Sequence, residues 1–179
     1  TEQAKIAADY LEQKQWKAPD ISRTHEIKTT PLAPPDIIPD VNFSPEELSE
    51  VIQKLKTKKN GGPDNTTAEL FKWLDHSNRT ILLTRLNHYL DNATIDEPLN
   101  KANIVSIFKK GDASNIENYR PIALLNIIYK ILARLICNRI QPYLDPHLQK
   151  TQYGFRKGRS TSQALYIIRK VQSLLERFE

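Results

Sequence analysis

Two clusters of basic residues, each interrupted by glycine, flank a long apolar stretch in the second half of this 179-residue sequence. The clusters cover residues 109–120 and 152–161, and the apolar stretch covers residues 122–144. Lysine and arginine neutralise phosphate charge, and glycine lets a backbone approach a phosphate closely. The spacing therefore favours a rigid apolar element that is held beneath a polyanion.

The excess positive charge lies entirely in the second half of the chain. The formal net charge is +5; residues 1–92 hold 12 Lys and Arg against 14 Asp and Glu, whereas residues 93–179 hold 14 against 7. This asymmetry favours a nucleic-acid partner, with a solvated basic face as the alternative for any single Lys or Arg.

Other kinds of site find little support in the sequence. The four histidines are scattered without metal-ligand spacing, and no P-loop, nucleophile elbow or His-Glu helix motif is present. Because the sequence has a single cysteine, a disulfide scaffold within one chain is excluded. This residue, Cys137, has apolar neighbours and is expected to be a buried small side chain. No apolar run approaches the roughly 20 residues that span a bilayer, so we expect no membrane insertion.

The first half of the chain predicts short helices separated by breakers. Residues 1–16 are expected to be the end of a helix anchored by Trp16, and the proline-rich residues 17–42 indicate a linker or an extended arm. Ser44 begins a capping pattern for a helix that breakers end near Lys59. Two further helices are expected, one after residues 65–67 and one over residues 79–90. Their inward residues are expected to be Leu70, Phe71 and Leu74, and Ile81, Leu82, Leu83, Leu86 and Leu90.

The second half predicts a two-stranded antiparallel ribbon followed by two helices. The strands are expected at residues 102–108 and from Tyr119, with a loop of about ten residues between them and Pro121 at an edge or limiting the second strand. Asn126 is expected to cap a long helix that Pro142 and Pro146 end. A last helix starts near residue 161. The long helix is expected to bury a stripe of Ile128, Leu132, Leu135, Ile136 and Ile140. The last helix carries Ala164, Leu165, Ile168, Val171 and Leu175 on one side.

Four blocks occur in order at residues 104–112, 118–126, 129–132 and 152–161, and a basic segment before Gly-Pro-Asp lies upstream at residues 58–64. Together they resemble the fingers region and the extra N-terminal block of reverse transcriptases from non-LTR (LINE-type) retrotransposons. The resemblance covers roughly residues 44 to 175.

The resemblance implies a nucleotide site on the ribbon. Lys109 or Lys110, together with Arg120, would contact the triphosphate of an incoming deoxynucleotide. A planar Arg fork and a mobile Lys ammonium suit a triphosphate during in-line phosphoryl transfer. The alternative is that Arg120 is a solvated edge-strand residue and that the lysines form a basic turn.

The resemblance also implies contacts with nucleic acid at two loops. The loop at residues 58–64, called the upstream loop below, would lie against the template-primer as a lid, with Lys58 and Lys59 on phosphates. The alternative is a turn that ends a helix, with solvated lysines. The loop at residues 152–159 would contact the template or the nucleotide pocket, with Phe155 either a stacking platform or a core residue. The residues expected to bind nucleic acid are Lys58, Lys59, Gly61, Gly62, Gln152, Phe155, Arg156, Lys157 and Arg159.

The fold implied by the resemblance is α+β and predominantly helical, as the fingers subdomain of a right-hand polymerase without its palm. Residues 1–43 would be a helix end and a linker, and residues 44–179 the N-terminal extension and fingers. Polymerases of this family use two metal ions, Mg²⁺ in the full-length protein, held by palm carboxylates. Because the sequence has no Asp-Asp pair, we expect no metal ligand and no catalytic residue in it, and no DNA synthesis by the chain alone. Both ends are expected to be fragment boundaries.

The expected partners are an RNA template, a DNA primer, deoxynucleoside triphosphates, and the palm and thumb of the same polypeptide, with no membrane. The parent element would act inside the cell, in the nucleus. A second hypothesis is a non-catalytic nucleic-acid-binding module derived from a reverse transcriptase, and a third is a helical interaction domain whose charge is incidental. Since the helices would pack on an absent sheet, we also expect an exposed apolar patch at Ile128, Leu132 and Leu165.

Overall fold

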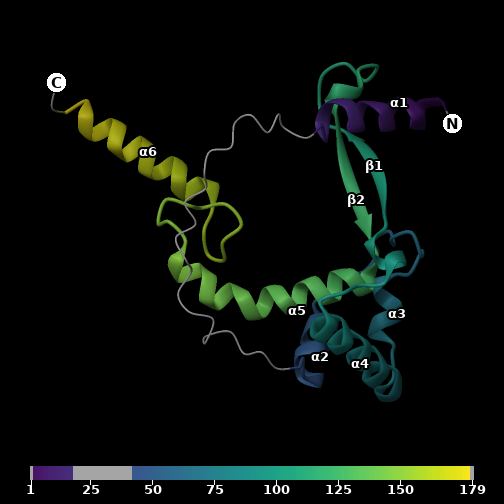
Figure 1. Cartoon of the computed structure of the whole chain (residues 1–179). Coiled ribbons are helices and arrows are strands. Elements are labelled where there is room, and N and C mark those ends of the chain that lie inside the picture. The colour runs from purple at the N-terminus through teal and green to yellow at the C-terminus, as the bar shows by residue number, and fades with distance from the viewer. Residues whose placement is uncertain (1, 18–41, 178–179) are drawn as a thin grey trace. The chain divides into compact units, whose positions relative to one another are not determined.

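The computed structural model describes residues 2–17 and 42–177 (Figure 1). The described chain is mostly helical with one two-stranded antiparallel sheet, which confirms the coarse fold class. The chain divides into two compact units, and the boundary falls within one helix, after Leu135. The described residues of the first unit are 2–17 and 42–135, and those of the second are 136–177.

At the N-terminus, α1 (Glu2–Tyr10) continues into a π-helical turn (Leu11–Gln15). The expected helix is therefore present, but its expected anchor is wrong: Trp16 is exposed, and Leu11 is the buried residue. The proline-rich segment that follows lies, apart from its ends, outside the described residues.

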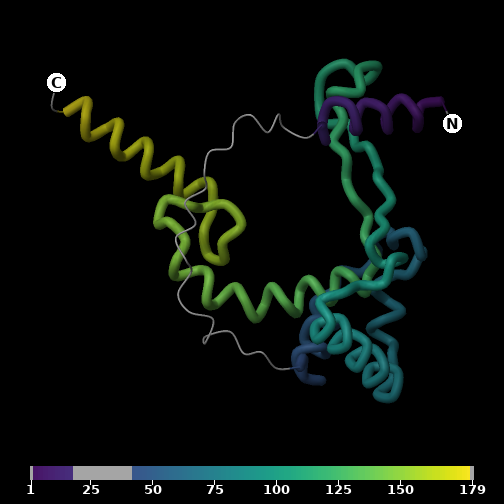
Figure 2. Tube along the Cα trace, in the orientation of Figure 1, coloured from purple at the N-terminus to yellow at the C-terminus, as the bar shows by residue number. Residues whose placement is uncertain are grey.

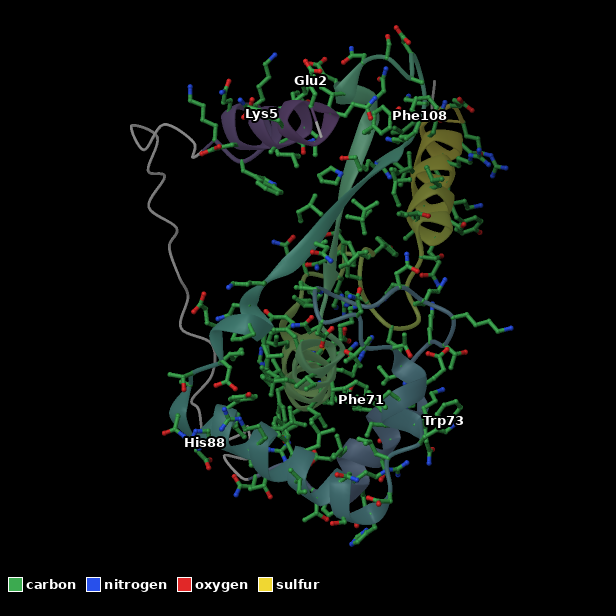
Figure 3. All side chains as sticks on the ribbon, turned by 90° about the vertical axis from the view of Figure 1, so that its right-hand side faces the viewer. Glu2, Lys5, Phe71, Trp73, His88 and Phe108 are labelled. Carbon is green, nitrogen blue, oxygen red and sulfur yellow. The ribbon has the colours of Figure 1, made fainter. Side chains whose placement is uncertain are left out.

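Three helices, α2 (Pro45–Gln53), α3 (Ala68–Lys72) and α4 (His76–Asn92), build the core of the first unit with the start of α5. Ser44 and Glu47 form the expected capping box, which confirms the predicted helix start, although α2 ends before the predicted Lys59. Phe71 is buried, whereas Trp73 is exposed just beyond α3 (Figure 3). The buried apolar residues of this core are Phe43, Leu48, Val51, Ile52, Ala68, Phe71, Leu82, Leu86, Tyr89, Ile127, Ile131, Leu132 and Leu135.

The sheet is a ribbon of β1 (Ala102–Phe108) and β2 (Tyr119–Leu125), as predicted, and a short 3-10 helix (Glu97–Asn100) precedes it. The register pairs Ala102 with Leu125 at the base and Phe108 with Tyr119 at the other end. Both strands are edges, so Pro121 is accommodated opposite Ser106 without ending β2. The connecting loop, residues 109–118, lies at the end of the ribbon away from α2 to α4 (Figure 2).

Helix α5 (Ile127–Leu144) differs from the predicted helix in three respects. Its buried face contains Ile127 and Ile131, one residue before the predicted stripe positions, together with Leu132 and Leu135. Cys137 is exposed, which contradicts its expected burial, because it lies roughly 200° around the helix from the buried Leu135. Pro142 lies within the helix rather than at its end.

The second unit contains the end of α5, a 3-10 turn (Asp145–His147), a loop, and α6 (Thr161–Leu175). Ser160 and Gln163 form a capping box at the start of α6. Leu165 is 55% exposed, in line with the predicted patch, but Leu132 is buried, so that part of the prediction is wrong. The large apolar side chains exposed on α6 are Leu165, Tyr166, Ile167, Ile168, Val171, Leu174 and Leu175.

Candidate nucleotide and nucleic-acid interface

Arg120 and Lys109 lie on the same face of the ribbon. Arg120 pairs with Ile107, and residues directly opposite each other in an antiparallel pair share a face. Lys109 is two residues beyond Ile107, and its backbone N–H continues the ladder by donating to the Asn118 carbonyl at 2.9 Å. Because side chains alternate along a strand, Lys109 joins the face of Arg120, whereas Lys110 lies in the bend that follows. All three basic residues are exposed.

The loop after Lys110 is held by its own hydrogen bonds. The Asp112 carboxylate accepts from the Ser114 N–H at 2.9 Å and the Ser114 hydroxyl at 2.7 Å, and these bonds lower the pKa of Asp112. The Asn118 side-chain amide donates to the Asp112 carbonyl at 2.8 Å. Gly111 has φ +93°, and a Cβ there would lie 2.8 Å from the Asn118 Nδ2. The lysines are therefore attached to an ordered turn that requires glycine.

The upstream loop presents Lys58 and Lys59 to solvent from a backbone that is held in place. Lys58 has φ +55°, and its backbone N–H donates to Glu69 Oε1 at 2.6 Å. This hydrogen bond is the largest cause of the lowered pKa of Glu69, which keeps that carboxylate charged. The side chain of Glu69, on α3, thus fixes the backbone position from which the side chains of Lys58 and Lys59 extend into solvent.

The two glycines of this loop pack against backbone. A Cβ on Gly61 would lie 2.8 Å from the carbonyl carbon of Asn65. A Cβ on Gly62 would lie 2.5 Å from the backbone nitrogen of Asn126 and 2.6 Å from the carbonyl carbon of Leu125. Gly62 is buried and Gly61 half-buried. Both positions require glycine because of close packing inside the protein.

Asn126 is the buried polar residue at the centre of this contact, with 2% of its surface exposed. Its Oδ1 accepts from the Asp64 N–H at 3.5 Å, and its Nδ2 donates to the Pro98 carbonyl at 3.0 Å. The sequence pattern pointed to Asn126 only as a helix cap. Its bonds to distant segments carry no local sequence signal.

Arg156, in the second unit, directs its guanidinium into its own loop. Its Nε lies 2.9 Å from Asp145 Oδ1 and its Nη2 lies 3.0 Å from Asp145 Oδ2, and the same guanidinium donates to the carbonyls of Asp145, Gln149 and Gln152. The Arg156 side chain is 8% exposed. The pairing raises the pKa of Arg156 and lowers that of Asp145. Asp145 is therefore the partner that holds this loop.

The other predicted residues of this loop are exposed. Phe155 has φ +59° and a fully exposed ring. Gln152 and Lys157 also face solvent, and the Arg159 guanidinium lies 5.7 Å from the centre of the Tyr153 ring. These residues belong to the second unit, whereas the ribbon and the upstream loop belong to the first.

Within residues 2–17 and 42–177, no group of three or more His, Cys, Asp or Glu side chains is arranged to hold a metal ion. Among the helices in those same ranges, none has the length and apolar character needed to cross a membrane.

Comparison with known proteins relates part of this sequence to one family. Residues 107–176 match the family described as reverse transcriptase (RNA-dependent DNA polymerase). The chain is 32% identical over 137 residues to the RNA-directed DNA polymerase from mobile element jockey of Drosophila melanogaster, covering 75% of this chain and 15% of that protein. It is 27% identical over 150 residues to the retrovirus-related Pol polyprotein from type-1 retrotransposable element R1 of Bradysia coprophila, covering 82% and 14%.

A third relative is the transposon TX1 uncharacterized 149 kDa protein of Xenopus laevis, 27% identical over 124 residues, covering 69% of this chain and 10% of that protein. Residues 107–176, which include most of the ribbon, α5 and α6, therefore belong to the reverse transcriptase family. The matched relatives come from non-LTR mobile elements, which confirms the expected kinship. The chain spans about 15% of the length of the first relatives it matches.

Proposed function

We propose that this chain forms the fingers region and N-terminal extension of a non-LTR reverse transcriptase, and that it binds the template-primer and the incoming deoxynucleoside triphosphate. In this proposal residues 1–43 connect to the rest of the polypeptide and residues 44–179 form the binding region. The observation that carries the proposal is the placement of Lys109 and Arg120 on one exposed face of the ribbon.

The triphosphate contacts are assigned to Arg120 and Lys109. Cross-strand neighbours displaced by two residues lie about 7–8 Å apart at the backbone, so both long side chains can reach neighbouring phosphates of one ligand. Arg120 supplies a planar fork of donors and Lys109 a compact charge. Lys110, in the bend beyond the end of β1, is assigned to the surrounding nucleic acid or solvent.

Contacts with the phosphates of the template-primer are assigned first to the exposed Lys58 and Lys59, and then to Lys157 and Arg159 of the second unit. Gln152 and Phe155 face solvent and could contact bases, the latter by stacking. Gly61, Gly62 and Arg156 are assigned the task of shaping the two loops, because Gly62 is buried and the donors of Arg156 are used within its loop.

Members of the reverse transcriptase family use divalent metal ions, which neutralise phosphate charge when bound. The residues that the structure describes contain no carboxylate cluster for such ions. The proposed steps here, binding and orienting phosphates, therefore rest on the basic side chains of the chain alone.

The test is a titration of the full chain with a labelled RNA–DNA primer-template at several salt concentrations. Each lost phosphate contact lowers the slope of log affinity against log salt by about 0.9, so Lys58→Ala/Lys59→Ala is expected to lower the slope by about 2. The matched control is Lys54→Ala/Lys101→Ala, because these lysines pair with Glu50 and Glu97. Equal slopes for wild type and the Lys58/Lys59 variant would contradict the proposal.

The second hypothesis, a non-catalytic nucleic-acid-binding module, makes a different prediction in the same assay. Such a module binds the primer-template through its basic loops and shows no binding of a labelled deoxynucleoside triphosphate that depends on Arg120.

A further inference from the structure

We infer that Asn126 is a positioning residue that fixes the Lys58–Lys59 loop against the base of the β1–β2 ribbon, so that the loop holds the template-primer at a set position relative to the nucleotide site on the ribbon. The inference rests on the proposed function, and it concerns a residue that contacts neither phosphate nor nucleotide in that proposal.

The first support is that the side chain of Asn126 joins segments far apart in the sequence. It reaches the Asp64 N–H, 62 residues away, and the Pro98 carbonyl, 28 residues away. Its own backbone directly follows β2, and Leu125 pairs with Ala102 at the start of β1. One side chain thus connects the upstream loop, the segment that enters β1 and the end of β2.

The second support is the shape of the loop at this contact. Gly62 lies so close to Asn126 and Leu125 that a single added methyl group would overlap backbone atoms. Backbone cannot move aside as the end of a flexible side chain can. The loop therefore packs directly on the junction between β2 and α5. The two hydrogen bonds of the Asn126 side chain hold it there.

The third support is that the chemistry requires an amide. The contact needs an acceptor for the Asp64 N–H and a donor for the Pro98 carbonyl, and asparagine supplies both at this length. Aspartate keeps the acceptor but cannot donate to Pro98. Alanine loses both and leaves the Pro98 carbonyl without its partner.

The consequence is a fixed spacing between two sets of basic residues. Arg120 is five residues along β2 from Leu125, or roughly 17 Å at the usual rise of an extended strand. Lys58 and Lys59 leave the loop that Asn126 holds at the base. The template-primer phosphates bound at the base of the ribbon and the nucleotide triphosphate bound near its tip would therefore be held at a set separation.

The experiment combines the Asn126→Ala substitution with Lys58→Ala/Lys59→Ala in the primer-template titration. Asn126→Ala alone is expected to lower the salt slope by about 2, as the double lysine variant does, and adding the lysine substitutions to Asn126→Ala is expected to change it little further. Asn126→Asp, which keeps the acceptor, is expected to give a smaller loss. If Asn126→Ala does not fold, the comparison is made with Asn126→Asp instead.

Two controls separate positioning from general loss of stability. Leu86→Ala removes a fully buried side chain of α4 and none of the groups that form the two Asn126 hydrogen bonds, and it is expected to lower stability while leaving the salt slope unchanged. Amide exchange of Asp64 is expected to accelerate in Asn126→Ala, which removes its acceptor, and not in Leu86→Ala.

The outcomes distinguish the inference from the proposed function. If the lysine substitutions weaken binding by the same factor in wild type and in a folded Asn126 variant, the positioning role is overturned and the proposed function stands. If the lysine substitutions have no effect in wild type, the proposed function of the loop fails, and the positioning role fails with it.

Discussion

Asp145 and Arg156 form a bidentate ion pair across the loop between α5 and α6. Arg156 Nε lies 2.9 Å from Asp145 Oδ1, and Arg156 Nη2 lies 3.0 Å from Asp145 Oδ2. The same guanidinium also donates to the Gln149 carbonyl at 3.0 Å. The Arg156 side chain therefore holds together the backbone of the loop from which Phe155, Lys157 and Arg159 extend.

The first prediction concerns Arg156→Lys. Lysine keeps the charge but cannot reproduce the fork, so the loop is expected to lose its fixed path and the melting temperature of the chain to fall. Amide exchange in residues 148–159 is expected to accelerate. Arg159→Lys is the control, since the Arg159 guanidinium lies over the Tyr153 ring and takes no part in the bidentate pair with Asp145, and it is expected to leave exchange unchanged. Identical exchange in both variants would contradict the assigned role.

The second prediction is the pH dependence of this pair. Arg156 lowers the pKa of Asp145 below its ordinary value of 3.8. A carboxyl group with a depressed folded pKa stabilises the fold above its unfolded pKa, and this contribution is lost as the pH falls through the folded pKa. The difference in melting temperature between wild type and Asp145→Asn is therefore expected to be constant above about pH 5 and to shrink below about pH 4. A difference that grows on acidification would refute this.

The third prediction compares two glycines of the basic loops. Gly62→Ala is expected to destabilise the chain by about 1–3 kcal/mol, because its new methyl group would overlap the Asn126 and Leu125 backbone. Gly154→Ala, whose Cβ would meet nothing within 4 Å, is expected to be neutral or slightly stabilising. Denaturant unfolding measures both. Equal stability of the two variants would show that the junction is less tightly packed than described.

The local parts of this fold could be predicted from the sequence because their causes are local. The Ser44 and Ser160 helix starts depend on residues three positions away, and the ribbon follows from a β-branched run and its breakers. The loop length between the strands was also predicted, since strand ends and turn residues are adjacent in the chain.

The errors arose where tertiary packing decides the outcome. An apolar helix such as α5 offers several neighbouring stripes. Leu132 and Leu135 were correctly predicted to be buried, but Ile131 was missed and Cys137 was assigned to the wrong side. The Asn126 contact joins segments 62 residues apart, and no periodicity reports such a contact. The Asp145–Arg156 pair was missed for the same reason, because its partners are joined by a loop without a repeating pattern.

The fourth prediction concerns the exposed apolar face of α6. An environment-sensitive dye is expected to fluoresce more strongly with this chain than with a compact monomer of similar size, because Leu165, Ile168 and Val171 are all more than half exposed. Leu165→Gln/Ile168→Gln is expected to reduce that fluorescence without lowering the melting temperature. Unchanged fluorescence in this variant would place the dye site elsewhere.

Arg120 and Lys109 on the ribbon are proposed to bind the triphosphate of the incoming nucleotide. One set of binding measurements tests this most directly. Binding of a labelled deoxynucleoside triphosphate to the full chain is compared among wild type, Arg120→Ala, Lys109→Ala and Lys110→Ala. Loss of a charged hydrogen bond costs about 1.5–3 kcal/mol, so Arg120→Ala and Lys109→Ala are each expected to weaken binding about tenfold or more, with Lys110→Ala close to wild type. Equal effects of the two lysine substitutions, or nucleotide binding that is indifferent to Arg120, would contradict the account.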